Sequence, residues 1–485
     1  MLVNVFFIFF NCMLNSDQQE AFECIKMFIQ HPTANTFVLK GYAGTGKTFL
    51  MQYLAAWLSE TDSEFKLLAS TGRAAAVLRG KTGFEAKTVH GELYHFSKVN
   101  GDDDNIPDDA PVDRFGQMTL QFTLRIPDDK VRIFIVDEAS MLSSEFMDNT
   151  SFASFGSGML LTDFFEYAGR NKIIFVGDPC QLPPVGQSFS PALDLAWLKE
   201  NKRHAVSYTL QRIERTNADN DILKLAHRVR DLSQKPQGEK YSKLPAGKLE
   251  NVILADSNDS LLSRYIIQYK ETGVNTALAI ARSNKMVHKI NREVRLNLHG
   301  EIDLPLQIGE VLLVTQNNYA APLTNGDFVT ITEIGELFNK ANLHFQKVKV
   351  RTMLSEKEYD ILLSLDILYS DSSNFTREQS KNLMVDFSKR VRSQKIKANS
   401  DKYKKAMMED EFLNCLKATY GYAVTCHKSQ GGEWDNIYLF LDKGMYAMKY
   451  EELHRWWYTA ITRTKNRIYS NNDWWISDYA EVFKD

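Results

Sequence analysis

Apolar and polar residues alternate along this chain in a pattern that predicts strands followed by helices. Short apolar runs lie at residues 37–39, 67–69, 133–136 and 173–176, and each is followed by a polar turn and a helical periodicity. Buried parallel strands have continuous apolar runs because helices cover both faces of their sheet. The first part of the chain therefore predicts an α/β lobe with a parallel sheet.

A second set of apolar runs, at residues 277–281, 437–441 and 467–469, predicts a second α/β lobe. We place the first lobe at residues 13–205 and the second at residues 206–485.

Two stretches interrupt this pattern. Residues 97–130 are rich in Asp, Gly and Pro and then alternate as MTLQFTLR, which predicts a β-hairpin inserted in the first lobe. Residues 301–413 interrupt the second lobe, with strand-like runs at 311–315 and 327–332 and a long, charged helical arm at 376–412.

Composition narrows the class of protein. A chain of 485 residues with 44% hydrophobic and 25% charged residues is long enough for two cores, which excludes a small binding module. The net charge of −3 gives no general basic field, so any nucleic-acid contact must be local. The five cysteines are scattered, which predicts a reduced intracellular protein without structural zinc.

The chain opens with the apolar segment MLVNVFFIFF. This segment has about half the length of a membrane span and lacks the basic flank of a signal peptide. We interpret residues 1–12 as an extension or a mis-assigned start, and we expect their deletion to leave activity and stability unchanged.

The strongest chemical signal is GYAGTGKT at residues 41–48, between an apolar strand and a helical segment. In this pattern the glycines let backbone N–H groups approach phosphates, Lys47 reaches the β and γ phosphates, and Thr48 presents its hydroxyl to Mg²⁺. A chance loop would lack the strand and the helix. The predicted ATP-binding residues are Gly41, Ala43, Gly44, Thr45, Gly46, Lys47, Thr48 and Phe49.

Two further strand ends carry side chains that phosphoryl transfer needs. In IFIVDEAS, Asp137 is placed to hold the metal and Glu138 to orient the attacking water. In GDPCQLPPVG, Asp178 and Gln181 are candidates to sense the γ phosphate, on a loop stiffened by two prolines. The alternatives are an exposed acidic strand end and a proline-rich surface turn.

Seven motifs in a fixed order resemble those of superfamily 1 helicases. They are the P-loop, LLASTGRAA (67–75), TVH (88–90), DEAS (137–140), GDPCQLPPVG (177–186), YAVTCHKSQGGEW (422–434) and YTAITRT (458–464). The chain is similar to the 5′-to-3′ branch, and most closely to Dda-type phage helicases and RecD-like proteins. The resemblance covers residues 16–469 except for 97–130 and 352–412. It implies two RecA-like P-loop NTPase lobes.

The resemblance assigns nucleotide contacts outside the P-loop. Gln18 matches the glutamine that reads adenine, with Gln19 as the alternative. Arg463 matches the arginine that reaches the γ phosphate from the second lobe, and Arg215 matches its partner, with Arg212 as the alternative. Both arginines supply positive charge when the lobes close. The predicted catalytic residues are Lys47, Asp137, Glu138, Gln181, Arg215 and Arg463.

Other motif positions are matched to DNA. The predicted DNA-binding residues are Thr71, Gly72, His90, Thr425, His427 and Lys428. Small hydroxyls, N–H groups and one or two cations suit phosphates that are bound without regard to sequence. Gln430 and Glu433 are expected to report the nucleotide state to the strand, and Gly432 and Glu433 are assigned to the nucleotide site. His427 in isolation would be interpreted as a packed core histidine.

The resemblance also interprets the two inserts. Residues 309–350 match a small SH3-like β-barrel, and residues 97–130 lie where the family has a wedge that splits the duplex. Phe115 and Phe122 are predicted to offer aromatic faces to a base pair. A hairpin that only caps the lobe is the alternative, because aspartates at 102–104 would repel DNA. The charged arm is either a solvated helix or a contact for DNA or a partner.

We therefore predict a monomeric, ATP- and Mg²⁺-dependent DNA helicase that moves 5′ to 3′ on single-stranded DNA and unwinds forked duplex. The alternatives are the motor subunit of a recombination exonuclease complex and an ATP-driven remodelling factor that does not unwind processively. Expected partners are DNA and proteins of replication, recombination or repair, with no membrane. The expected location is the cytoplasm of a bacterial or phage-infected cell.

Overall fold

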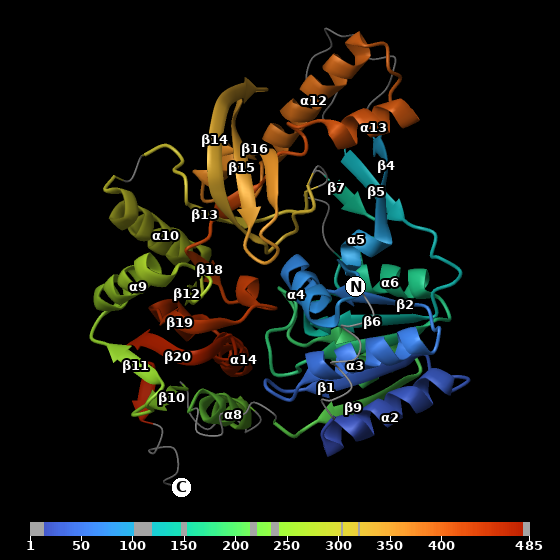
Figure 1. Cartoon of the computed structure of the whole chain (residues 1–485), viewed down its shortest axis with the longest axis vertical. Helices are drawn as coiled ribbons and strands as arrows, with labels where there is room; N and C mark the ends of the chain where they lie inside the picture. The colour runs from blue at the N-terminus through green and yellow to red at the C-terminus, as the bar shows by residue number, and fades with distance from the viewer. Residues whose placement is uncertain are drawn as a thin grey trace.

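The computed structural model describes residues 14–100, 119–146, 153–213, 221–233, 242–301, 304–318 and 321–478. Two α/β lobes lie side by side, and an antiparallel sheet with a helical arm lies above them (Figure 1). The segment 1–12, interpreted above as an extension, lies outside the described residues.

The first lobe is built on a parallel sheet with the strand order β3-β2-β6-β8-β1-β9. Its strands are β1 (Thr36–Gly41), β2 (Phe65–Ala69), β3 (Ala86–Thr88), β6 (Ile133–Asp137), β8 (Lys172–Gly177) and β9 (Ala205–Leu210). The predicted boundary between residues 205 and 206 is therefore wrong, because β9 pairs with β1 up to Leu210 and belongs to the first lobe. Phe134 packs into the core on one face and Ile135 into the core on the other, so the sheet is buried on both sides. The four apolar runs predicted in this lobe are confirmed as strands.

Helices and short 3-10 turns cover this sheet. They are α2 (Ser16–Gln30), α3 (Lys47–Glu60), α4 (Gly72–Thr82), α5 (Val89–Leu93), α6 (Leu160–Ala168), α7 (Leu195–Glu200), η2 (Ala139–Met141) and η3 (Pro191–Leu193). Polar side chains fix several helix starts. Asn15 and Gln18 form a capping box at α2, and the Thr71 hydroxyl accepts a hydrogen bond from the N–H of Ala74 at the start of α4.

The second lobe repeats the architecture with the parallel order β11-β20-β19-β12-β18. Its strands are β11 (Val252–Ala255), β12 (Ala277–Ala281), β18 (Ala423–Thr425), β19 (Trp434–Phe440) and β20 (Thr464–Asn471), with β10 (Leu244–Gly247) paired to β21 (Ile476–Asp478) beside them. The covering helices and turns are α8 (Asp221–Ser233), α9 (Asn258–Thr272), α10 (Asn284–His299), α14 (Tyr450–Ile461), η4 (His427–Ser429) and η5 (Lys443–Ala447). The apolar runs predicted here are confirmed.

The insert in the second lobe forms an antiparallel sheet, here called the insert sheet, with the order β16-β15-β14-β13-β17. Its elements are β13 (Val311–Val314), β14 (Phe328–Lys340), β15 (Leu343–Thr352), β16 (Glu358–Ser364), α11 (Leu365–Leu368) and β17 (Ala418–Tyr420). Gly326 takes φ +96° in the turn before β14, a conformation that glycine adopts without steric cost. Closure into an SH3-like barrel stays a prediction.

The charged arm consists of two helices, α12 (Arg377–Ser393) and α13 (Asp401–Glu409), where the sequence predicted one long helical segment. Its apolar side chains, including Met384, Phe387 and Tyr403, are buried. The arm thus packs an apolar face, whereas Lys389 on α12 and Lys395 in the segment after it are exposed; a contact of these charges with DNA or a partner stays a prediction.

The insert in the first lobe contains two antiparallel strands, β4 (Tyr94–Asn100) and β5 (Thr119–Leu124), here called the pin, with β7 (Ala153–Phe155) alongside. The predicted hairpin is confirmed in these strands, whereas Phe115 and the aspartates at 102–104 lie outside the described residues. The prediction for Phe122 is wrong. Its ring is 5% exposed and stacks on Phe155 at 4.7 Å between centroids, so it cannot stack on a base pair.

Candidate functional site: the cleft between the lobes

The P-loop follows β1 directly and turns into α3. Gly44 and Gly46 both have positive φ, and Gly46 is the N-cap of α3 without a side-chain cap. Helix α3 therefore begins with N–H groups that have no side-chain acceptor at its cap, the usual setting for a bound phosphate. The Lys47 ammonium donates to the carbonyls of Gly41 at 2.6 Å and Tyr42 at 3.2 Å, which holds it against the loop.

The other predicted P-loop residues surround this turn. Thr45 is fully buried, and its hydroxyl donates to the carbonyl of Tyr42 at 2.9 Å. A Cβ atom at Gly41 would lie 2.7 Å from Thr45 Oγ1, so the strand end has room for glycine alone without a shift. Thr48 and Phe49 are half-buried at the start of α3. The glycines and the helix terminus thus form a cradle that fits a polyphosphate.

The structure places Gln18, and not Gln19, at the P-loop. Gln18 is 3% exposed, its Nε2 donates to the carbonyl of Thr45 at 3.2 Å, and its Oε1 accepts from the N–H of Asn15 at 3.2 Å. Gln19 instead bonds Glu23 on the surface. A Cβ at Gly46 would lie 2.3 Å from Gln18 Nε2, so the glutamine is packed directly under the phosphate turn.

Asp137 and Glu138 stand at the carboxyl end of β6, next to the P-loop. Glu138 has φ 50°, a left-handed conformation that costs free energy for a residue with a side chain, and its N–H donates to Asp137 Oδ1 at 2.8 Å. Burial raises the pKa of Asp137 to about 7, the Glu138 carboxylate adds to the rise, and the Lys47 ammonium opposes it. Carboxylates whose charge is this poorly compensated fit a cation.

A magnesium site built on Asp137 and Thr48 agrees with the donor chemistry. Among the residues that the structure describes, no group of three or more His, Cys, Asp and Glu side chains is arranged to hold a metal. Magnesium bound to a nucleotide takes one or two protein oxygens and completes its shell with phosphate and water. The residues present therefore fit a metal that arrives with the nucleotide.

The loop after β8 lies against both lobes. Asp178 is fully buried, and burial raises its pKa, although the charges of Lys47 and Arg463 lower it. The side chains of Gln181 and Gln430 are buried, and the Oε1 atom of each has no hydrogen-bond partner among the described residues. Buried acceptors of this kind normally have a hydrogen-bond partner. A donor group on a bound ligand, or an ion in the cleft, would satisfy these two oxygens.

Arg463 lies just beyond the end of α14 and is 5% exposed. Its guanidinium donates to the carbonyls of Thr459 at 3.1 Å and Gly432 at 3.3 Å and to the Thr462 hydroxyl at 3.2 Å. These acceptors are all neutral. The guanidinium is thus held in place by its own lobe with its charge available to a phosphate.

The remaining predicted nucleotide residues fall in different places. Arg215 lies outside the described residues, and its alternative, Arg212, is exposed at the end of the first lobe, where its N–H donates to Asp17. Gly432 is buried beside Arg463, whereas Glu433 is exposed. The structure therefore brings Gly432 to the cleft but leaves the assignment of the partner arginine as a prediction.

Arg73 is a residue of the cleft that the sequence analysis did not assign. Arg73 lies on α4 of the first lobe, and its side chain reaches the second lobe. There its guanidinium lies 4.5 Å from the ring centroid of Trp434 and 5.1 Å from that of Phe328. Burial lowers its pKa to about 10, the carboxylate of Asp327 raises it, and the charge of Arg463 lowers it further. Arg73 lies within the motif LLASTGRAA, but its contact with the second lobe could not be predicted because its two aromatic partners are distant in sequence.

Tyr458, also unassigned above, bridges the lobes within YTAITRT. Its hydroxyl accepts a hydrogen bond from the N–H of Ala43 in the P-loop and donates to Asp178.

The predicted DNA residues lie around the lobe interface. Gly72 packs so closely against the turn of the insert sheet that a Cβ there would lie 1.7 Å from Thr324 Oγ1. Thr71 is the N-cap of α4, and Thr425 ends β18. Burial lowers the pKa of His427 and of Lys428. Both side chains are half-buried.

His90 connects the DNA-binding residues to the pin. Its ring lies 5.8 Å from Tyr94 and 6.1 Å from Phe155, and the aromatic contacts continue from Phe155 to Phe122 and on to Phe96. Burial lowers the pKa of His90 to about 4, although Asp163 opposes this. His90 is therefore a neutral hydrogen-bonding group at neutral pH.

The far end of the pin is held by the arm. The N–H of Val99 donates to Asn399 Oδ1 at 2.8 Å, and Asn399 Nδ2 donates to the carbonyl of Val99 at 3.1 Å. Val99 is buried in one cluster with Met384, Phe387 and other apolar residues of the arm. We call this pair of hydrogen bonds the Asn399 clamp. It joins an insert of the first lobe to an insert of the second.

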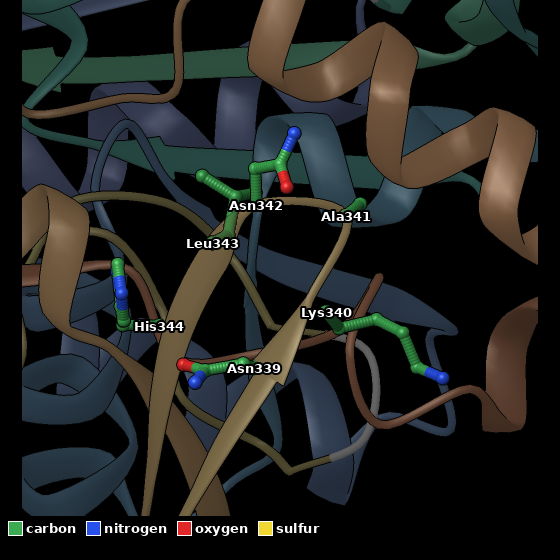
Figure 2. Close-up of a pocket in the computed structure, with 6 residues that line it drawn as sticks. All are labelled: Asn339, Lys340, Ala341, Asn342, Leu343 and His344. Atoms are coloured by element: carbon green, nitrogen blue, oxygen red, sulfur yellow. The ribbon is translucent and has the colours of Figure 1, made fainter.

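A cavity of about 410 Å³ lies away from the cleft, at the turn between β14 and β15. Figure 2 shows its lining, residues 339–344, at the tip of that hairpin. The Lys340 ammonium lies 5.4 Å from the ring of Phe412, and His344 pairs with Asp366. This surface hollow is open and polar, and no catalytic group lines it.

The fold and the cleft define the class of protein: a P-loop NTPase with two RecA-like lobes, in which residues of the second lobe reach the nucleotide cradle of the first. Residues 13–243 match the family described as an AAA domain, and residues 420–469 match the UvrD-like helicase C-terminal domain. These two matches, and relatives named as DNA helicases, support the resemblance to superfamily 1 helicases of the 5′-to-3′ branch.

Individual relatives resemble the chain at low identity. The chain is 22% identical to the uncharacterized protein R530 of Acanthamoeba polyphaga mimivirus, over 94% of this chain and 99% of that protein. It is 23% identical to the ATP-dependent RecD2 DNA helicase of Deinococcus radiodurans over 89% of this chain and 46% of that protein. It is 24% identical to the ATP-dependent DNA helicase dda of Enterobacteria phage T4, over 68% and 66%.

A solved structure covers almost the same length. The Pif1 helicase from Bacteroides in complex with ADP-AlF3 and single-stranded DNA is 17% identical, covers 97% of this chain and 96% of that one, and has a TM-score of 0.48.

Proposed function

We propose that this chain is an ATP-dependent DNA helicase that moves 5′ to 3′ on single-stranded DNA and separates forked duplex. The observation that carries the proposal is the composition of the cleft. The first lobe contributes the cradle of Lys47 and the carboxylates of Asp137 and Glu138, and the second lobe contributes Arg463. A motor needs this division, because turnover then depends on the distance between the lobes.

Each of these side chains has a role that its position supports. Lys47 and the N–H groups at the start of α3 would bind the β and γ phosphates, and Thr48 with Asp137 would hold Mg²⁺. Glu138 would orient the attacking water, and Arg463 would stabilise the charge that develops on the transferred group. ATP supplies the γ phosphoryl group whose hydrolysis drives the movement.

The DNA path is assigned to residues that bind phosphates without regard to sequence. Thr71, His90, Thr425, His427 and Lys428 offer hydroxyls, a neutral imidazole and a partly buried cation. Relatives named as DNA helicases support DNA as the substrate. The chain covers only about half of the RecD2 protein, so the activity of that whole protein is transferred here as part of the proposal.

The cellular setting is also proposed. We infer that the chain acts as a monomer in the cytoplasm of a bacterial or phage-infected cell and works with proteins of replication, recombination or repair. Within the described ranges no helix combines the length and the apolar character of a membrane span.

The decisive experiment is strand displacement on matched substrates. A duplex with a 5′ single-stranded tail, one with a 3′ tail and a blunt duplex are incubated with the protein, ATP and Mg²⁺. We expect strand release from the 5′-tailed duplex and little from the other two. DNA-stimulated ATP hydrolysis without strand release would favour the remodelling factor, and release from the 3′-tailed duplex would contradict the direction.

A further inference from the structure

The hydroxyl of Tyr458 lies inside the nucleotide cradle of the opposite lobe. Tyr458 belongs to α14 of the second lobe and is 2% exposed. Its oxygen accepts a hydrogen bond from the backbone N–H of Ala43 at 3.0 Å, and its hydrogen is donated to Asp178 Oδ2 at 2.8 Å. One hydroxyl group therefore connects the P-loop, the loop after β8 and α14.

The hydrogen bond from Tyr458 satisfies one oxygen of the buried Asp178 carboxylate. The Asp178 carboxylate is fully buried, and its other oxygen, Oδ1, accepts from the N–H of Cys180 at 3.0 Å. Lys47 and Arg463, the two cations assigned to the phosphates, stabilise the charged form of Asp178, since both lower its pKa. The Tyr458 hydroxyl thus binds a buried anion that lies in the field of both catalytic cations. Without it, one carboxylate oxygen would be buried without a donor.

Two further side chains of the second lobe hold the same loop. Thr459 Oγ1 accepts from the N–H of Leu182 at 2.9 Å, and Gln430 Nε2 donates to the carbonyl of Leu182 at 3.2 Å. Thr459 also accepts from Arg463 through its carbonyl. The end of α14 is therefore fastened to the first lobe directly before Arg463 leaves the helix.

We propose that Tyr458 is a positioning residue for hydrolysis, which fixes α14 on the P-loop and on Asp178 so that Arg463 is delivered to the γ phosphate. This inference rests on the proposed ATPase function and adds a residue to it. The Tyr458 hydroxyl is neutral, so it does not itself supply charge to the phosphates. It sets the distance between the arginine of one lobe and the cradle of the other.

The expected kinetic signature follows from that role. The groups that bind ground-state ATP, Lys47 and the N–H groups at the start of α3, belong to the first lobe and remain when the hydroxyl is removed. Arg463 acts on charge that develops in the transition state. Loss of the hydroxyl should therefore lower kcat and leave the KM for ATP nearly unchanged.

The test is Tyr458→Phe, which removes one oxygen and keeps the ring. Tyr450→Phe is the matched control, because Tyr450 lies on the same helix and donates to the carbonyl of Leu232 within its own lobe at 3.0 Å. We expect Tyr458→Phe to lower kcat about tenfold or more, with KM for ATP within about threefold, and Tyr450→Phe to leave both within about twofold. ATP hydrolysis is measured with and without single-stranded DNA, and thermal unfolding is measured for each variant.

The outcomes separate the inference from the function that it presupposes. Equal kcat in Tyr458→Phe and Tyr450→Phe would overturn the inference, as would a raised KM with unchanged kcat, which would indicate a role in binding. If wild-type protein hydrolyses ATP without any response to DNA, the proposed helicase function fails, while the ratio of kcat values still tests Tyr458.

A second variant tests the same contact from the other side. Asp178→Asn removes the charge to which Tyr458 donates, so we expect the same selective loss of kcat. The double variant should be no slower than the slower single variant, because both changes break one interaction. An unaltered kcat in Asp178→Asn would contradict the inference even if Tyr458→Phe failed to fold. Where both single variants fold, multiplicative losses in the double variant would contradict it as well.

Discussion

The nucleotide cleft and the pin–arm contact both join the two lobes, but they are built in different ways. The cleft is made of charged and polar groups at strand ends, and it contains buried groups with shifted pKa values, such as Asp137 and Arg73. The pin–arm contact is an apolar cluster around Val99 closed by the two hydrogen bonds of the Asn399 clamp. The difference suggests a division of labour, in which the cleft changes with the nucleotide and the pin–arm contact holds its geometry.

The largest expected effect tests the cleft at its centre. Lys47→Ala should abolish measurable ATP turnover, because the ammonium that stabilises transferring charge is lost. The Lys47 ammonium donates to the carbonyls of Gly41 and Tyr42 at the rim of the lobe and Lys47 is not among the buried core residues, so the melting temperature should change little. Turnover is measured by phosphate release. Substantial hydrolysis by the folded variant would remove the P-loop from the mechanism.

The next effect tests whether the second lobe takes part in the chemistry. Arg463→Ala should slow hydrolysis about a thousandfold and leave nucleotide affinity nearly normal, because such arginines act on the transition state. Arg467→Ala, an exposed arginine on β20, is the control and should be without effect. Single-turnover hydrolysis and nucleotide titration separate the two quantities. If turnover does not change, another arginine has this role.

A smaller effect is expected at His90, where the DNA-binding residues meet the pin. Burial lowers its pKa to about 4, so the folded state disfavours the proton that the unfolded chain binds below pH 6.5. The stability that depends on neutral His90 is complete above pH 6.5 and is lost as the pH falls towards 4. By pH 5 the loss is about 2 kcal/mol.

His90→Gln should remove this pH dependence, because glutamine does not titrate. The free energy of unfolding is measured by urea denaturation of both proteins at pH 7 and pH 5. The wild type should lose about 2 kcal/mol more than the variant between these pH values. Parallel losses in the two proteins would mean that His90 is not protonated on unfolding in this range.

The smallest effect tests the pin–arm contact. Asn399 has φ 57°, a left-handed conformation that Asp also tolerates, so Asn399→Asp keeps the backbone and loses the Nδ2–H donor to Val99. We expect the free energy of unfolding to fall by about 1 kcal/mol and the strand-separation rate to fall several-fold. DNA-stimulated ATP hydrolysis should stay within about twofold of the wild-type rate.

The matched control is Asn297→Asp, because Asn297 donates within α10 to the carbonyl of Glu293. Strand displacement and ATPase are measured on the same forked substrate. A parallel decrease of both activities in Asn399→Asp would mean that the clamp belongs to the ATPase cycle, and unchanged unwinding would mean that the pin does not need the arm.

The positions of the cleft residues could be located from the sequence because these residues follow apolar strands. Lys47, Asp137 and Asp178 each lie within a few residues of a strand end, and the carboxyl ends of parallel strands share one edge of a sheet. The strand runs themselves were predicted for the same reason, since burial on both faces leaves a continuous apolar signal.

The pin–arm contact could not be predicted in this way. Val99 and Asn399 are far apart in the chain, and no local pattern relates them. Alternation in MTLQFTLR correctly indicated a strand, but it did not show which face of Phe122 is covered, because β7 and Phe155 come from elsewhere. Arg73 shows the same limit, because its motif was recognised but its aromatic partners, Trp434 and Phe328, belong to the other lobe.

The Asn399 clamp has a consequence for how this molecule can change during evolution. Both of its hydrogen bonds go to the backbone of Val99, so the clamp recognises the strand and not the identity of the side chain. Substitutions at position 99 are limited by the apolar pocket alone, and the pin can therefore diverge in sequence while the arm stays attached. Position 399 has less freedom, since it needs both an amide and a residue that accepts positive φ. Among homologues, asparagine should persist there longer than any residue of the strand that it holds.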